Sequence, residues 1–145
     1  MQALPPANAV YPVQHLPILK AYADQRGLVS LITHYVPTAM DVDAGTVVLA
    51  LVLDTLSGRS PLYRLEEFFA QQDTALLLGQ AVPPHALNDD TAGRVLDRLY
   101  DFGTLRLCTA CAVRAAMRFG LERRSVHFNS RGDSMHGQTA RDDAV

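Results

Sequence analysis

The sequence predicts an all-α fold: a compact multi-helix bundle with an orphan C-terminal β-strand and a flexible tail. Three observations support this prediction. Apolar residues recur at spacings of three and four through most of the chain, as in amphipathic helices. Capping residues and glycines bracket these segments. With 145 residues and a hydrophobic content of 48%, the chain is long enough to bury a core of its own.

The N-terminal part predicts an arm followed by two helices. Residues 1–14 contain three prolines and little periodicity, which indicates an extended arm. Pro17 is typical of a first helical turn, and Gly27 ends that helix. Residues 28–35 predict a second short helix, which stops before Pro37.

The middle of the chain predicts a central helix. Asp43 is a good capping residue, the helix is expected to run to about Ser57, and Gly58 follows its end. Residues 47–53 are apolar on all sides, so a buried strand is the alternative. The length of the segment and its caps favour a buried helix.

Two shorter helices are expected next. Ser60 and Pro61 have the cap-plus-proline pattern of a helix start. Asp73 caps a short leucine-rich helix that Gly79 closes, and residues 81–87 predict a loop. The inward face of the first helix is expected to consist of Leu62, Leu65 and Phe69.

The last two helices meet at Gly103. Asn88 begins the first of them, and Thr104 is expected to cap the second, which runs to Phe119. The predicted inward residues of the first are Ala92, Val95, Leu96 and Leu99. Those of the second are Leu105, Cys108, Ala112, Ala115 and Phe119.

The domain organisation follows from where the helical pattern stops. Residues 15–122 are expected to form the helical domain, after the arm at 1–14. Residues 125–128 predict a buried strand, which needs partners that the chain does not supply. Residues 123–145 are therefore expected to be the start of a truncated second domain and poorly ordered.

Charge is distributed unevenly along the chain. Residues 1–90 hold four basic and nine acidic side chains, whereas residues 91–131 hold eight arginines and three acids. Arginine suits contact with phosphate or guanine, so the asymmetry indicates an anionic partner; a solvated helix face is the alternative.

The sequence shows neither a signal peptide nor an apolar run of membrane-spanning length. We expect a cytoplasmic protein with reduced thiols and no membrane partner.

No motif of an enzyme stands out. Cys108 and Cys111 have C-x-x-C spacing but lie in an apolar helix pattern, so buried structural cysteines are expected rather than a zinc or redox site. The five histidines are scattered, and no nucleotide-binding loop or nucleophile turn is present. The paired acids at 66–67 and 89–90 suit solvated or capping roles. We expect no catalysis and no cofactor.

The helix that follows Asn88 is the best candidate for DNA contact. Thr91, Arg94 and Arg98 project together at spacings of three and four, as in a recognition helix. Asp89 and Asp90 lie at the same end and would repel phosphate, which opposes deep docking in a groove.

Several separated blocks resemble insertion-sequence transposases of the DDE type, in the IS4-like group. The blocks are HLPI at 15–18, GLV at 27–29, VLDTLSGRSPLYRLEEFF at 52–69 and NDDTAGRVLDRLY at 88–100. The resemblance covers about residues 10–128. It implies an N-terminal helical region, classified as a domain of unknown function, ahead of an RNase H-like catalytic domain.

The resemblance also implies what the chain lacks. The family's first catalytic strand ends in a motif like VHFD, whereas this chain reads VHFN, so Asn129 occupies the position of the first metal-binding acid. Asparagine lacks the charge that two-metal chemistry uses to hold Mg²⁺. Mg²⁺ is thus expected only for an intact family member.

The predicted function is DNA binding, at the terminal inverted repeats of an element, without catalysis. Thr91, Arg94 and Arg98 are the predicted groove contacts, and the predicted phosphate contacts are Arg59, Arg64, Arg123 and Arg124. The alternatives are a non-functional remnant or a protein-interaction module. Such a module would form homo-oligomers, or inhibit intact transposase by forming hetero-oligomers. Its expected surfaces are residues 47–53 and the face of Leu62, Leu65 and Phe69.

Overall fold

The computed structural model describes residues 11–58 and 60–120, and within these ranges it is all-helical, with no strand. The elements are α1 (Leu16–Arg26), α2 (Leu28–Tyr35), α3 (Ala44–Ser57), the 3₁₀ turn η1 (Leu62–Arg64), α4 (Leu65–Ala70), α5 (Thr74–Leu78), the 3₁₀ turn η2 (Pro84–Leu87), α6 (Asp89–Phe102) and α7 (Thr104–Arg118). The predicted all-α class is confirmed for this part of the chain. The predicted strand at 125–128 and the tail after it lie outside the described residues.

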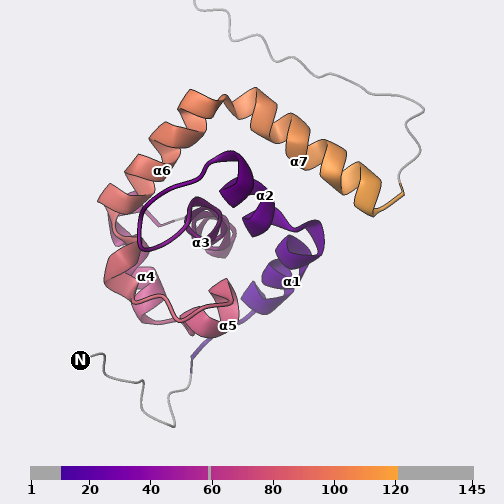
Figure 1. Cartoon of the computed structure of the whole chain (residues 1–145). Helices are drawn as coiled ribbons and strands as arrows, with labels where there is room; N and C mark the ends of the chain where they lie inside the picture. Colours follow the sequence, from indigo (N-terminus) through magenta and orange to yellow (C-terminus); the bar gives the residue numbers. More distant parts are fainter. Residues whose placement is uncertain (1–10, 59, 121–145) are drawn as a thin grey trace, which may run out of the picture.

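Helix α3 stands at the centre of the molecule. Figure 1 shows it end-on, with the other helices arranged around it. It contacts α1, α2, α4, α5 and α6, and the side chains of Val47, Ala50 and Leu53 have no exposed surface. A helix that is apolar on all sides needs cover on all sides. The predicted central buried helix is therefore confirmed.

The start of α3 is fixed to α2 by one carboxylate. Asp43 Oδ1 accepts the Thr46 backbone N–H at 2.9 Å and the Thr33 hydroxyl at 2.7 Å, while Oδ2 accepts the Thr46 hydroxyl at 2.8 Å. Burial acts to raise the pKa of Asp43, but these donors outweigh it and hold the pKa below its ordinary value. The two helices also approach closely at Gly45, where a Cβ would lie 2.2 Å from the Val29 carbonyl oxygen.

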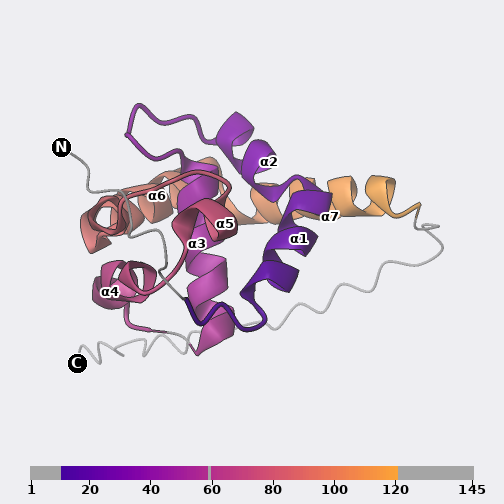
Figure 2. The same ribbon diagram turned by 90° about the horizontal axis from the view of Figure 1, so that it is seen from below.

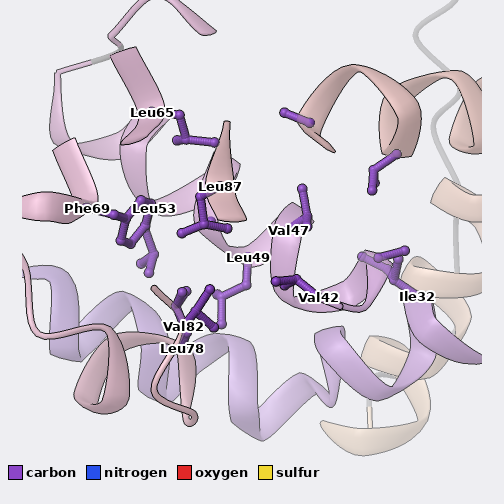
Figure 3. Close-up of a cluster of buried hydrophobic side chains, with 14 of the residues drawn as sticks. Ile32, Val42, Val47, Leu49, Leu53, Leu65, Phe69, Leu78, Val82 and Leu87 are labelled. Atoms are coloured by element: carbon purple, nitrogen blue, oxygen red, sulfur yellow. The ribbon is translucent and has the colours of Figure 1, made fainter. Parts of the chain in front are cut away.

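The core forms where α4, α5 and η2 close over α3. Figure 3 shows the resulting cluster, in which Leu49 and Leu53 of α3 lie among side chains from these elements. Burying each large apolar side chain contributes about 1.5–3 kcal/mol, so this cluster is the main source of stability. The covering residues include Leu65, Phe69, Leu78, Val82 and Leu87.

Both predicted interaction surfaces form part of this core. Within residues 47–53, the side chains of Val47, Leu49 and Leu53 are at most 1% exposed, and Leu65 and Phe69 are equally buried. These buried side chains cannot contact a partner without unfolding, so they do not form the predicted dimer interface, although Val48, Leu51 and Val52 are half-buried. Leu62 was expected to lie inward with them, but it is 36% exposed because it belongs to η1 rather than to α4.

The connections on either side of α4 differ from the predictions. Ser60 does not cap a helix; its backbone N–H donates to Asp54 Oδ2 at 3.1 Å, and Pro61 precedes η1. The buried carboxylate of Asp54 therefore holds the end of α3 to the start of the next element. Residues 81–87 are not a simple loop either, because their second half forms η2.

Helix α7 lies at the outer edge of the bundle. Figure 2 shows it extending along one side, and its main contacts among the described elements are with α6, α2 and α1. None of its side chains is buried in the part of the chain that the structure describes, and Leu105 is 71% exposed.

The predicted inward face of α7 is correct only in part. Ala112 and Ala115 line a hollow against α1 and α2, and Arg26 lies 5.8 Å from the ring centroid of Phe119. Leu105 and Cys108 are exposed, whereas Leu107 and Cys111 pack toward the core.

The junction before α7 explains this error. Gly103 ends α6 with φ +102° and is also the N-cap of α7, whereas Thr104 is already helical and makes no capping bond. This abrupt change of direction sets which side of α7 meets the bundle, and spacing along the sequence does not reveal it. In α6, Ala92, Val95 and Leu99 are buried as predicted, but Leu96 is 43% exposed.

A second glycine joins three helices at one point. Gly27 has φ +62°, in the left-handed region, and it both ends α1 and begins α2. A Cβ at this position would lie 2.8 Å from Arg114 Nη2, so the guanidinium of Arg114 in α7 packs directly on the glycine.

No helix in the described ranges has the length and apolarity needed to span a bilayer.

Candidate nucleic-acid interface

The first turn of α6 is held by side-chain caps. Asn88 Oδ1 accepts the backbone N–H of Thr91 at 2.8 Å, and Asn88 Nδ2 donates to the carbonyl oxygen of His85 at 3.0 Å. The predicted helix start is confirmed. These bonds fix η2 to α6, so that Thr91 and the residues one turn later occupy defined positions.

Thr91 and Arg94 line a polar groove of about 670 Å³ beside the start of α6. Its other walls are the segment 39–42, which leads into α3, and the segment 80–86, which leads into η2. Arg94 is exposed and Thr91 is half-buried. The structure thus brings together two of the residues that were predicted to contact a DNA groove. They lie on one concave surface of the protein, which we call the α6 groove.

Arg98 lies one turn farther along the same side of α6 and does not line the groove. It is exposed, and its Nη1 is 3.5 Å from the carbonyl oxygen of Pro37, at the outer limit of a hydrogen bond. Arg94 and Arg98 therefore form a short basic flank of α6, with the groove at its N-terminal end.

One exposed ridge of α6 is largely acidic. Asp90, Asp97 and Asp101 are exposed and lie on it at spacings of seven and four, and Arg94 lies on the same side, four residues after Asp90 and three before Asp97. A recognition helix that entered a DNA groove on this ridge would bring three carboxylates toward phosphates. Arg98 and Thr91 lie at the edge of this ridge, so a contact centred on them would meet less of this repulsion than one centred on Arg94.

The other predicted phosphate contacts are not gathered at this site. Arg64 lies in η1, where its guanidinium is 5.7 Å from the ring centroid of Tyr63 and its Nε is 3.8 Å from Glu67 Oε2. An exposed ion pair of this kind contributes little stability and leaves the side chain available. Arg59, Arg123 and Arg124 lie outside the described residues, as does Asn129.

Sequence reasoning missed three polar residues that line the α6 groove: Gln80, His85 and the exposed Asp41. Gln80 Nε2 donates to the Thr46 hydroxyl at 3.1 Å, which ties the groove to the start of α3. None of the three belongs to a spacing pattern. Only the folding of the chain between α5 and α6 brings Gln80 and His85 beside Arg94.

The cysteines differ from the prediction of buried structural residues. Cys108 is exposed and Cys111 is half-buried, and both are free thiols. Burial raises the pKa of the Cys111 thiol, and the neighbouring Cys108 adds to the effect. Among the described residues, no three histidine, cysteine or acidic side chains are grouped as a zinc site would require.

Comparison with known proteins places the chain in a family. The model of the family described as a domain of unknown function, DUF4277, matches residues 8–113, which is more than half of the chain. No curated protein and no solved structure gives a match. The matched range contains α1 to α6, the α6 groove and most of α7. The chain therefore belongs to the DUF4277 family of domains of unknown function.

Proposed function

We propose that this chain is the N-terminal DNA-binding and assembly module of an insertion-sequence transposase of the DDE type, working in the cytoplasm without catalysis of its own. The observation that carries the proposal is the α6 groove, where Thr91 and Arg94 lie at one concave polar surface, with Arg98 one turn away. The resemblance of residues 52–69 and 88–100 to such transposases supplies the substrate, the terminal inverted repeats.

The electrostatics of α6 define how DNA would be contacted. The acidic ridge of Asp90, Asp97 and Asp101 keeps the helix from lying deep in a groove, so the contact is made by the basic flank. Arg94 reaches DNA beside the α6 groove, and Arg98 meets the phosphate backbone. Arg64, Arg59, Arg123 and Arg124 add sequence-independent contacts to phosphate.

Binding of labelled duplexes, followed by fluorescence anisotropy, tests this function. The duplexes are the terminal repeats that flank the coding region and a scrambled duplex of equal length. Arg94→Ala is expected to weaken binding to the repeats by about 1–3 kcal/mol, and Arg123→Ala to weaken binding to both duplexes equally. Each lost phosphate contact should reduce the slope of log affinity against log salt by about 0.9.

Arg106→Ala is the matched control, since it removes the same charge from α7, where Arg106 packs over the Phe102 ring at 5.4 Å. The affinity of Arg106→Ala for the repeats should stay within about twofold of that of the unmodified chain. Such a change is far smaller than the tenfold loss that about 1.4 kcal/mol would cause. An affinity that does not change between 50 and 200 mM salt, or an equal loss for Arg94→Ala and Arg106→Ala, would contradict contact through α6.

Assembly through protein contacts is the second candidate function. The surfaces predicted for it are buried, but α7 presents apolar side chains to solvent, with Leu105 71% and Met117 70% exposed. This is the surface that favours an oligomer of this chain or a mixed oligomer with an intact transposase.

A further inference from the structure

Helix α7 carries two thiols that the proposed function does not use. Cys108 and Cys111 are three residues apart, and neither takes part in a disulfide. Side chains at this spacing are neighbours on one side of a helix, with Cβ atoms about 5–6 Å apart. Burial and then the neighbouring Cys108 raise the pKa of the Cys111 thiol, which agrees with this proximity. We call the pair the α7 dithiol.

The α7 dithiol is poorly suited to forming an internal disulfide. That bond needs Cβ atoms about 3.5–4.5 Å apart, closer than an undistorted helix brings residues three apart. Both cysteines lie well inside α7 (Thr104–Arg118), so closing the bond would distort several helical hydrogen bonds. The two sulfur atoms are therefore better placed to share a third atom than to bond to each other.

The α7 dithiol lies where α7 meets the corner of α1 and α2. Cys108 is exposed, so the pair is open to solvent. Cys111 is half-buried and lines a hollow of about 180 Å³ between these helices. A solute can thus reach the sulfur atoms from one side, while protein limits the access of water from the other. The other residues that line the hollow are Arg26, Leu28, Leu31, Ala112 and Ala115.

The number of donors selects the kind of ion. Within the described ranges, no third histidine, cysteine or acidic side chain joins the two cysteines. Structural zinc takes four protein ligands, so two thiolates alone do not make a zinc site. Thiolates select soft ions such as Cu⁺, which forms stable complexes with only two of them.

The charges near the α7 dithiol favour such a complex. One Cu⁺ ion held by two thiolates carries a single negative charge. Helix α7 contains three arginines and no acidic residue, and Arg26 lines the same hollow as Cys111. These positive charges stabilise an anionic complex and oppose the effect of burial on the Cys111 thiolate.

We propose that Cys108 and Cys111 form a two-coordinate site for one soft monovalent cation of the Cu⁺ type. Each thiol releases its proton to solvent as its bond to the ion forms, and the oxidation state of the ion does not change. The bound ion links two successive turns of α7. This site goes beyond the proposed DNA-binding function and does not depend on it.

Competition with a coloured Cu⁺ chelator, bicinchoninate, tests the site under anaerobic conditions. The reduced full-length chain is expected to remove one Cu⁺ ion per chain from the chelator. Cys108→Ser and Cys111→Ser should each abolish this uptake at the same chelator concentration. Circular dichroism of each variant verifies that the helices are retained.

A variant with displaced thiols is the matched control. Cys111→Ser combined with Val113→Cys keeps two cysteines in α7 but spaces them five residues apart, on different sides of the helix. This variant should take up no Cu⁺. Uptake equal to that of the unmodified chain would overturn the proposal, because any two thiols would then suffice.

Stoichiometry and a second ion complete the test. No uptake by the unmodified chain, or one ion per two chains, would overturn a site built within a single chain. An excess of Zn²⁺ should leave the uptake of Cu⁺ unchanged, and displacement by Zn²⁺ would overturn the two-coordinate site. None of these results affects the test of DNA binding, which uses no metal.

Discussion

Helices α3 and α7 are nearly equal in length, with 14 and 15 residues, yet they occupy opposite environments. Eight residues of α3 are buried, whereas none of α7 is buried within the described ranges. Both segments are rich in apolar side chains. The difference shows that apolar content alone does not decide which helix is buried. Helix α3 lacks basic residues, and its middle is apolar around the whole circumference. Helix α7 instead meets the bundle along one side, which includes Arg114.

Truncating one leucine in each helix should expose this difference most clearly. Leu53→Ala removes a side chain with no exposed surface and is expected to lower the free energy of unfolding by about 2–5 kcal/mol. Leu105→Ala, at a side chain that is 71% exposed, should change it by less than about 0.5 kcal/mol when the chain is monomeric. Urea denaturation at low micromolar concentration measures both. Equal losses would mean that α7 is as buried as α3.

Adding a methyl group to two glycines sharpens the comparison between the interior and the edge. Gly45→Ala in α3 would place a Cβ 2.2 Å from the Val29 carbonyl oxygen, so the two helices must separate at a cost of about 1–3 kcal/mol. Gly93→Ala in α6 meets nothing within 4 Å and should stabilise the chain by up to about 1 kcal/mol, because alanine favours helix. The two melting temperatures should shift in opposite directions, and a matching decrease in both would contradict the close approach of α2 and α3.

A smaller effect is expected from the charge at the start of α3. The pKa of Asp43 is lowered in the folded chain, so its contribution to stability is present above the ordinary value of 3.8 and is lost as pH falls through the folded value. Asp43→Asn should cost about 1 kcal/mol at pH 7 and remove this acid-dependent part. Urea midpoints between pH 7 and pH 2.5 measure the difference, and Asp97→Asn is the control at an exposed carboxylate. Parallel pH profiles for Asp43→Asn and the unmodified chain would contradict the role of Asp43.

The sequence predicted the helices well because their ends carry local signals. Asp43, Asp73 and Asn88 each cap the helix that follows, and Gly27 and Gly79 end helices in left-handed conformations, as expected. These features depend on a few neighbouring residues. The start of α4 was mispredicted because Ser60 instead bonds to Asp54, six residues earlier in the chain.

What the sequence could not predict depends on contacts between distant segments. Which side of α7 packs inward is set by the turn at Gly103 and by the corner of α1 and α2, so spacing alone placed Leu105 and Cys108 inward and missed Leu107 and Cys111. The α6 groove likewise needs segment 80–86 to fold against α6, and His85 carries no local sign of this. Thr91 and Arg94 were predicted correctly to lie together because both belong to one helix.

The packing of Arg114 on Gly27 has a consequence for how the chain opens. Helix α7 buries no side chain of its own within the described residues and packs on the core through the half-buried Leu107 and Cys111, so its detachment from the corner of α1 and α2 uncovers less apolar surface than the loss of α3 would. Its amides should then exchange with deuterium through a local opening, at a lower free energy than those of α3, which exchange only on global unfolding. Deuterium exchange measured along the chain should therefore separate the edge of the bundle from its centre.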